Sequence, residues 1–291
     1  MTRFPKWLRR EISEGSTLGT HETISEFQLN TVCESALCPN RVECFSRRTA
    51  TFMILGDICT RACGFCAIQT GKPVQVEENE PMRVAQAAAK LGLKHVVVTS
   101  VARDELKDEG AGVFHDTILA IRELLPKATI EVLTPDFHAR PELIARICEA
   151  RPDVYNHNIE TVKRLQKSVR PQASYERSLR VLELVKSYAP EITAKSGMML
   201  GLGEQLEEVI ETLKDLRSAG CEIITIGQYL KPKEGKLEIE EFIAPEVFSL
   251  LTETGKRMGF REVYAGPYVR SSYHAGEAYA RSLSAAIPEK V

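Results

Sequence analysis

The sequence predicts an α/β fold with a parallel sheet, in the form of a partial (β/α)6 barrel. Strand–helix alternation gives right-handed β-α-β units, which build parallel sheets. About six such units are present, fewer than the eight that close a full barrel. A partial barrel is the natural fit, but the pattern alone does not fix strand order, so a doubly wound sheet is the alternative. The six short apolar runs occupy residues 51–56, 94–100, 129–135, 153–160, 192–200 and 222–227.

The segments between these runs have helical periodicity. Apolar residues recur three and four positions apart with polar residues between them, which is typical of amphipathic helices. The last of these segments ends with Gly220, and glycine is the residue most often found just after a helix. The predicted helices lie within residues 81–92, 112–126, 140–150, 174–188 and 204–220.

Composition excludes two classes of partner. The chain has 291 residues and a net charge of −2, so no global basic field indicates nucleic acid. No apolar run approaches the roughly 20 residues that span a bilayer, so we expect no membrane partner. Eight cysteines without an apolar leader indicate a reducing compartment, and we expect the cytoplasm.

Six of the cysteines form two triplets, each one ligand short of four. Cubanes of four irons and four sulfides take one protein ligand per iron, so a triplet leaves one iron open. A closed zinc site would need a fourth ligand, and disulfide frameworks suit short secreted chains. The spacing favours iron–sulfur sites over both. The first triplet is C-x4-C-x5-C at Cys33, Cys38 and Cys44, and the second is C-x3-C-x2-C at Cys59, Cys63 and Cys66.

The two remaining cysteines and one histidine are expected in the core. Cys148 continues a helical stripe of apolar residues, and Cys221 leads into an apolar run. His157 lies in the run at residues 153–160 and could be a ligand or an acid, but a hydrogen-bonded core histidine is the better interpretation.

Polar residues follow most of the predicted strands. In parallel barrels, catalysis takes place at the carboxyl ends of the strands. The second triplet follows the first run, and polar segments follow the second, fourth, fifth and sixth runs. We therefore expect the site at this rim, although capping of the following helices explains some of the polar residues there.

The second triplet, with aromatic Phe65 before its last cysteine, resembles the signature of the radical S-adenosylmethionine enzymes. The apolar run at residues 51–56 precedes it directly, as in that family. The resemblance implies a 4Fe–4S cluster whose open iron binds S-adenosylmethionine. It also implies reductive cleavage to a 5′-deoxyadenosyl radical, which abstracts hydrogen from unactivated carbon.

A narrower resemblance spans residues 30–276. Together with the first triplet, TSVARDEL, YNHNIETV, SVRPQASYERSL, KSGMMLGLGE, TIGQYLKP and GPYVRSSYHA look like the lipoyl synthase family. The family often has two acids after the arginine of the first segment, and a glycine pair further on. Here the residues are Asp104 and Glu105, then Glu109 and Gly110, which leaves the contacts of this loop less defined.

The resemblance implies two sulfur insertions, at C6 and C8 of an octanoyl-lysine on a lipoyl carrier domain. The first triplet would hold an auxiliary 4Fe–4S cluster that donates the sulfurs, and one S-adenosylmethionine would be cleaved per sulfur, two per lipoyl group. The fourth ligand of the auxiliary cluster would be a serine of the RSSY segment at residues 270–273, and we favour Ser272 over Ser271. Oxygen matches a cluster iron less well than thiolate does, so this ligand can be released.

The resemblance also assigns contacts with S-adenosylmethionine at the strand ends. Helix capping by Asn158 is an equally good alternative, and Arg170 suits a carboxylate through its forked donors. The resulting cofactor-binding set is Phe65, Thr99, Ser100, Asn158, Glu160, Arg170 and Lys195. The implied units are an N-terminal extension at 1–48, the partial barrel at 49–232, and a C-terminal extension at 233–291 that closes the barrel mouth.

Further partners follow from the resemblance. The octanoylated carriers would be E2 subunits of 2-oxoacid dehydrogenases and the H protein of glycine cleavage. A flavodoxin- or ferredoxin-type protein would supply electrons, and a cluster carrier would rebuild the auxiliary cluster consumed in turnover. Two alternatives stay open: another two-cluster radical enzyme, of biotin-synthase type or with an electron-relay cluster, and a non-enzymatic metal scaffold.

Overall fold

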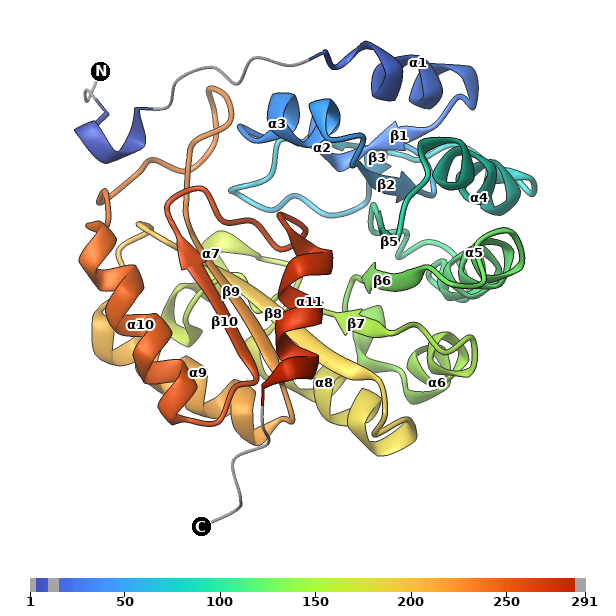
Figure 1. The fold of residues 1–291 in the computed structure, drawn as a ribbon. Coiled ribbons are helices and arrows are strands. Elements are labelled where there is room, and N and C mark those ends of the chain that lie inside the picture. The colour runs from blue at the N-terminus through green and yellow to red at the C-terminus, as the bar shows by residue number, and fades with distance from the viewer. Residues whose placement is uncertain (1–3, 10–15, 286–291) are drawn as a thin grey trace.

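A computed structural model describes residues 4–9 and 16–285. In these residues an eight-stranded sheet has the order β1-β2-β5-β6-β7-β8-β9-β10, so it curves without closing (Figure 1). All neighbours pair in parallel except β1 with β2. The strands are β1 (Asn30–Thr31), β2 (Thr51–Ile54), β5 (His95–Ser100), β6 (Thr129–Leu133), β7 (Val154–Asn156), β8 (Thr193–Leu200), β9 (Ile223–Gln228) and β10 (Glu262–Gly266).

The predicted fold is confirmed. Each of the six apolar runs contains a strand, and these strands are neighbours in chain order, as a partial barrel requires. The structure adds β10, a parallel strand from the predicted C-terminal extension, beside β9. Two short strands, β3 (Ile58–Cys59) and β4 (Gln69–Thr70), pair in the loop after β2.

Helices surround the barrel and contribute to both extensions (Figure 1). The five predicted helices are present within about two residues of their expected bounds. Gly220 has a φ of +87° just past the end of α9, as predicted. The α-helices are α1 (Leu18–Glu26), α2 (Val32–Ser35), α3 (Arg41–Ser46), α4 (Glu80–Leu91), α5 (Ala111–Leu124), α6 (Pro141–Glu149), α7 (Gln166–Val169), α8 (Tyr175–Tyr188), α9 (Leu206–Ser218), α10 (Pro245–Arg257) and α11 (Ala275–Ser284). The 3₁₀ turns among the described residues are η1 (Lys6–Leu8), η2 (Phe137–Ala139) and η3 (Lys163–Leu165).

The hydrophobic core lies between the sheet and the outer helices. In β6, Ile130 and Val132 face this core, so alternation sends Glu131 into the barrel interior. Cys148 and Cys221 are buried in the core, as predicted. The barrel interior therefore holds polar side chains, among them the paired Glu131 and Lys195.

Segments that follow β9 contact both ends of the barrel. Near the carboxyl ends of the strands, Leu237 N donates to Gly64 O (3.1 Å) in the cysteine loop. At the amino ends, α11 packs against His95, the first residue of β5, and Arg281 pairs with Glu262, the first residue of β10. No helix in the described residues is long and apolar enough to cross a membrane.

Candidate functional site

The second cysteine triplet lies where the chain leaves β2, at the carboxyl end of the barrel. Cys59, Cys63 and Cys66 line one hollow of about 90 Å³. None of them is in a disulfide. Cys59 Sγ accepts hydrogen bonds from the backbone N–H groups of Arg61 (3.4 Å) and Ala102 (3.3 Å). The loop thus presents three free thiols to one space, as the spacing predicted.

A buried ion-pair network fixes this loop. The Arg61 guanidinium donates to Asp104 (2.7 Å) and to Asp136 (2.8 Å), and Arg177 also contacts Asp136. Burial acts to raise the pKa of Asp136, but Arg61 outweighs it and holds that pKa below its usual range. Gln172 accepts from Ala62 N (2.6 Å), which clamps the loop backbone. Sequence analysis missed Arg61 and Asp136, although Asp136 follows a predicted strand.

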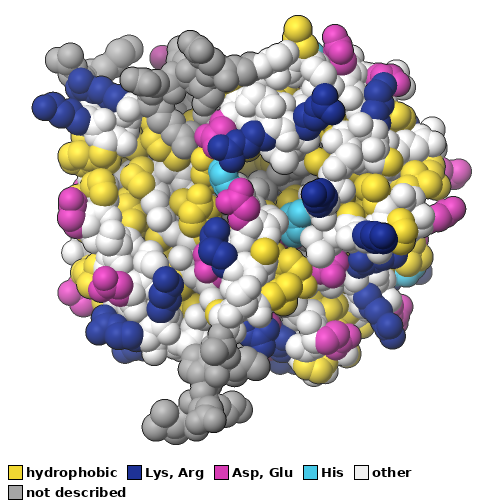
Figure 2. All heavy atoms as spheres, viewed as in Figure 1, with side chains coloured by type: hydrophobic (Ala, Val, Ile, Leu, Met, Phe, Trp, Pro, Cys, Tyr) yellow, Lys and Arg dark blue, Asp and Glu magenta, His cyan; other side chains and the backbone are white. Residues whose placement is uncertain are grey.

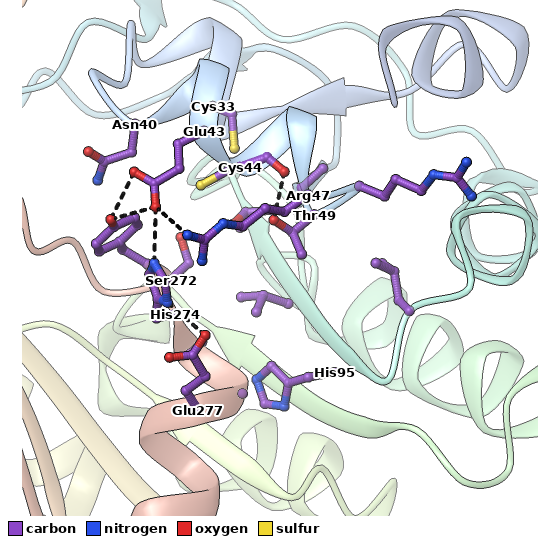
Figure 3. Close-up of a pocket in the computed structure, with 18 of the residues that line it drawn as sticks. Cys33, Asn40, Glu43, Cys44, Arg47, Thr49, His95, Ser272, His274 and Glu277 are labelled. Atoms are coloured by element: carbon purple, nitrogen blue, oxygen red, sulfur yellow. Dashed lines mark hydrogen bonds and ion pairs between the residues drawn. The ribbon is translucent and has the colours of Figure 1, made fainter. Parts of the chain in front are cut away.

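The first triplet lines a larger cavity, of about 440 Å³, together with Ser272. Cys33 lies on α2 and Cys44 on α3, with Cys38 between them, and Ser272 lies in the loop before α11 (Figure 3). On the face of the molecule shown in Figure 2, basic, acidic and histidine side chains gather around a hollow of the surface. The structure therefore brings the three cysteines and the favoured serine to one cavity, although Cys44 and Ser272 are 228 positions apart in the sequence.

Both sets of thiols fit iron–sulfur clusters by their donor chemistry. Burial raises the pKa of Cys33 and Cys63 to about 11 and that of Cys44 to about 12, and neighbouring cysteines add to each shift. Burial likewise raises the pKa of Cys66. Gathered, desolvated thiolates need a positive partner, and metal binding releases their protons.

The two serines of RSSY have different surroundings. Ser271 Oγ donates to Asn158 Oδ1 (2.8 Å), just beyond the end of β7. Ser272, not Ser271, lines the cavity of the first triplet. This arrangement favours the choice of Ser272 as the ligand, which stays a prediction.

Ser100 has the strongest position among the predicted cofactor contacts. Its hydroxyl is buried at the wall of the second-triplet hollow and has no hydrogen-bond partner among the described residues. A buried hydroxyl without a partner is costly, so a bound polar group would satisfy it. Thr99, by contrast, donates across the sheet to Leu133 O (2.9 Å). Phe65 packs against the apolar cluster that includes Val169 and Tyr229.

Asn158, Glu160 and Arg170 gather near the second triplet. Asn158 Nδ2 donates to Glu160 Oε1 (3.0 Å), and Arg170 Nη1 donates to the backbone carbonyls of Asn158 and Ile159. Arg170 also lowers the pKa of Cys63 against the larger effect of burial, which indicates its proximity. Burial raises the pKa of Glu160. Contact of these side chains with a cofactor stays a prediction.

Lys195 forms an ion pair inside the barrel. Its Nζ donates to both oxygens of Glu131 (2.8 and 2.9 Å), and both side chains are almost fully buried. Lys195 lies in the amino-terminal half of β8, away from the strand ends that carry the cysteine loop. Contact between Lys195 and the cofactor stays a prediction, and it would compete with this ion pair.

His157 is a hydrogen-bonded core histidine, as predicted. Its ring nitrogens contact Thr134 O (2.9 Å) and Ser178 Oγ (3.1 Å), which leaves neither for a ligand. Burial, together with Arg170, lowers the pKa of His157 to about 4.

The depressed pKa of His157 predicts a loss of stability in mild acid. The unfolded state binds this proton near pH 6.5 and the folded state only near pH 4, so folding stability falls as pH falls through that window. For the apoprotein we expect a loss of about 2 kcal/mol between pH 6.5 and 5. Urea unfolding at several pH values measures it. His157→Gln, which lacks the titrating ring, should have a flatter profile, and an identical profile would contradict the assignment.

A family model described as the Radical SAM superfamily matches residues 53–243. The chain therefore belongs to the radical S-adenosylmethionine superfamily. Among solved structures, the hydrogenase maturase HydG aligns with a TM-score of 0.58 at 14% identity, over 92% of this chain and 67% of that one. Methylornithine synthase aligns with a TM-score of 0.57 at 15% identity, over 96% and 81%. These two likenesses support the fold alone.

Curated relatives narrow the assignment. A lipoyl synthase of Caldanaerobacter subterraneus subsp. tengcongensis is 53% identical over 273 residues, which cover 94% of this chain and 96% of that protein. A lipoyl synthase of Rubrobacter xylanophilus is 52% identical over 274 residues, 94% of this chain and 85% of that protein. Within the superfamily, the chain belongs to the lipoyl synthase family.

The family confirms the predicted fold class and chemistry. The chain is a radical S-adenosylmethionine enzyme, a sulfurtransferase whose cofactors are S-adenosylmethionine and 4Fe–4S clusters. A non-enzymatic metal scaffold is thereby excluded. The residues that hold each cofactor remain to be assigned from the geometry described above.

Proposed function

We propose that this enzyme inserts sulfur at C6 and C8 of an octanoyl-lysine carried by a lipoyl carrier domain. Cys59, Cys63 and Cys66 hold the cluster that binds S-adenosylmethionine. When bound, one cluster would supply the electron that cleaves S-adenosylmethionine to a radical, and the auxiliary cluster would supply the sulfur atoms. The protein holds these groups apart, places the acyl chain and excludes water.

The observation that supports the proposal most is the composition of the 440 Å³ cavity. It brings Cys33, Cys38 and Cys44 together with Ser272, a ligand set of three thiols and one hydroxyl. A sulfur donor needs an iron that can be released, and oxygen matches a cluster iron less well than thiolate does.

The same cavity offers room for an acyl chain. Its wall includes the apolar side chains of Leu91, Leu93 and Val97, beside the sulfur ligands. Its volume is in the range of small-molecule sites, about 300–1,000 Å³. Val97 lies on β5, whose last residue, Ser100, lines the other hollow. A chain along β5 would therefore run from one cysteine site toward the other.

We also propose the division into an N-terminal extension (1–48), a partial barrel (49–232) and a C-terminal extension (233–291). The first triplet precedes β2, and RSSY follows β10. Contacts between the extensions support it: Asn40 Nδ2 donates to Tyr268 O (2.8 Å), and Tyr273 Oη donates to Glu43 (2.9 Å). Each extension thus contributes ligands to one auxiliary cluster.

The chemistry defines the protein partners. The carriers are octanoylated E2 subunits and the H protein of glycine cleavage, and a flavodoxin- or ferredoxin-type protein is the electron source. A cluster carrier rebuilds the auxiliary cluster, since its sulfur leaves with the product. The cytoplasm is the proposed location, and eight cysteines outside disulfides support a reducing compartment.

The direct test is anaerobic reconstitution, followed by S-adenosylmethionine, a reductant and an octanoyl-lysine peptide. Mass spectrometry should find a peptide with two added sulfurs and about two deoxyadenosines per product, with loss of the auxiliary cluster. Deoxyadenosine without peptide sulfur, or sulfur-free turnover with an intact auxiliary cluster, would instead favour another two-cluster radical enzyme.

Replacing Ser272 by alanine should separate the two clusters functionally. We expect deoxyadenosine formation to continue while peptide sulfur falls by at least about tenfold, because a missing ligand disturbs only the auxiliary site. Iron analysis and Mössbauer spectroscopy should find the loss of one oxygen-ligated iron environment. Unchanged sulfur insertion in the variant would contradict the assignment of Ser272.

A further inference from the structure

The loop that carries Ser272 is held at both sides. On one side Tyr273 Oη donates to both oxygens of Glu43 (2.9 and 3.0 Å), and His274 Nε2 lies 3.3 Å from the same carboxylate (Figure 3). Glu43 is on α3, next to Cys44. Hydrogen bonds therefore hold this side of the loop against α3, the helix that carries the proposed cluster ligand Cys44.

The other side of the loop reaches into the barrel. Ser271 Oγ donates to Asn158 Oδ1 (2.8 Å), and Asn158 Nδ2 donates to Glu160 Oε1 (3.0 Å). Ser271, Asn158 and Glu160 thus form a continuous hydrogen-bonded chain. Glu160 is half-buried. Arg170, which donates to Asn158 O (3.1 Å), follows Val169, whose carbonyl accepts from Gly64 N of the cysteine loop (2.9 Å), so this end of the chain lies beside the second triplet.

The approach of Ser271 depends on a glycine. A Cβ on Gly197 would lie 2.6 Å from Ser271 Oγ, 2.7 Å from Thr225 Oγ1 and 2.8 Å from Asn158 Oδ1. Real Cβ atoms do not come this close to such atoms. Gly197 of β8 therefore leaves the space in which Ser271 and Asn158 meet.

The adjacent residues Ser271 and Ser272 thus lie toward the two different cysteine sites. Ser271 is bonded to a candidate cofactor residue, and Ser272 lines the cavity of Cys33, Cys38 and Cys44. We propose that Ser271 is a positioning residue that couples cofactor binding at Asn158 and Glu160 to the placement of Ser272 beside the first triplet. The inference rests on the proposed cofactor role of Asn158 and Glu160.

The proposed coupling depends on the short stretch of backbone between the two hydrogen-bonded residues. One residue, Ser272, lies between the two anchored residues Ser271 and Tyr273, so it has little freedom to move independently of them. A cofactor that orders Asn158 and Glu160 also orders the acceptor of the Ser271 hydrogen bond. By linkage, the loop must then affect cofactor affinity by the same factor as the cofactor affects the loop.

The test is hydrogen exchange of residues 268–274 in the anaerobically reconstituted enzyme, with and without S-adenosylmethionine. In the wild type the cofactor should slow exchange in this loop. In Ser271→Ala the slowing should be lost, and S-adenosylmethionine should bind about two- to tenfold more weakly, the effect of one hydrogen bond. Ser284→Ala, a hydroxyl deletion at the exposed end of α11, should behave as the wild type.

A third variant separates the two anchors. Glu43→Gln weakens the other side of the loop, so exchange should be faster both with and without cofactor, while the cofactor-dependent slowing persists. If the wild type shows no slowing, or Ser271→Ala keeps both slowing and affinity, the coupling is wrong. Neither readout requires sulfur insertion, so an enzyme that shows the coupling but forms no lipoyl product would contradict the proposed function alone.

Discussion

Replacing Cys63 by alanine is expected to abolish 5′-deoxyadenosine formation. The three thiols of the second triplet line one hollow, and the loop around them is clamped by Arg61. Removal of one thiol leaves two protein ligands for a cluster that needs three to keep a single iron open. Activity should fall to background, more than about 100-fold, since a ligand matters at least as much as its supporting contacts. Mass spectrometry of deoxyadenosine after anaerobic reconstitution measures it.

Matched cysteine variants locate the effect. Cys38→Ala removes a thiol from the other cavity, so deoxyadenosine should still form while peptide sulfur disappears. Cys148→Ala removes a core thiol and should leave both reactions intact, with a small loss of stability. If Cys38→Ala also blocked deoxyadenosine formation, the two triplets would not be independent sites.

The clearest strand signals in the sequence share one property. Parallel strands buried on both faces give continuous apolar runs, and residues 51–56 and 95–98 have such runs. The edge strand β10, Glu262–Gly266, was missed because it begins with glutamate and ends with glycine, and three of its five residues are only partly buried. Its place beside β9 depends on tertiary pairing rather than on local pattern.

The site was predictable where covalent chemistry fixes the spacing. Three thiols within one loop reveal a site by their separation alone, whereas Arg61 and Asp136 are 75 residues apart and meet only after folding. A usable signal existed for Glu131 and Lys195: each is a single charge within a buried run, and the two charges are opposite. Buried charges require partners, so a pair was the natural expectation.

Lys195→Met is expected to destabilise the apoprotein by about 3–5 kcal/mol, the usual cost of breaking a buried pair. Burial acts to raise the pKa of Glu131, but Lys195 and His95 outweigh it and lower that pKa. Without Lys195, the carboxylate stays buried beside His95 Nε2 at 3.5 Å and Asn156 Nδ2 at 3.0 Å. Urea unfolding of the apoprotein at pH 7 measures the loss.

The second replacement decides whether charge or packing is responsible. In Lys195→Met with Glu131→Leu no unpaired charge remains, so much of the lost stability should return, as it does for other buried pairs replaced by apolar residues. A stable single variant that binds S-adenosylmethionine poorly would instead make Lys195 a cofactor ligand. Because the pair joins β6 to β8 across β7, its loss should loosen this part of the barrel wall. A destabilised single variant rescued by the double replacement therefore assigns Lys195 to the barrel rather than to the cofactor.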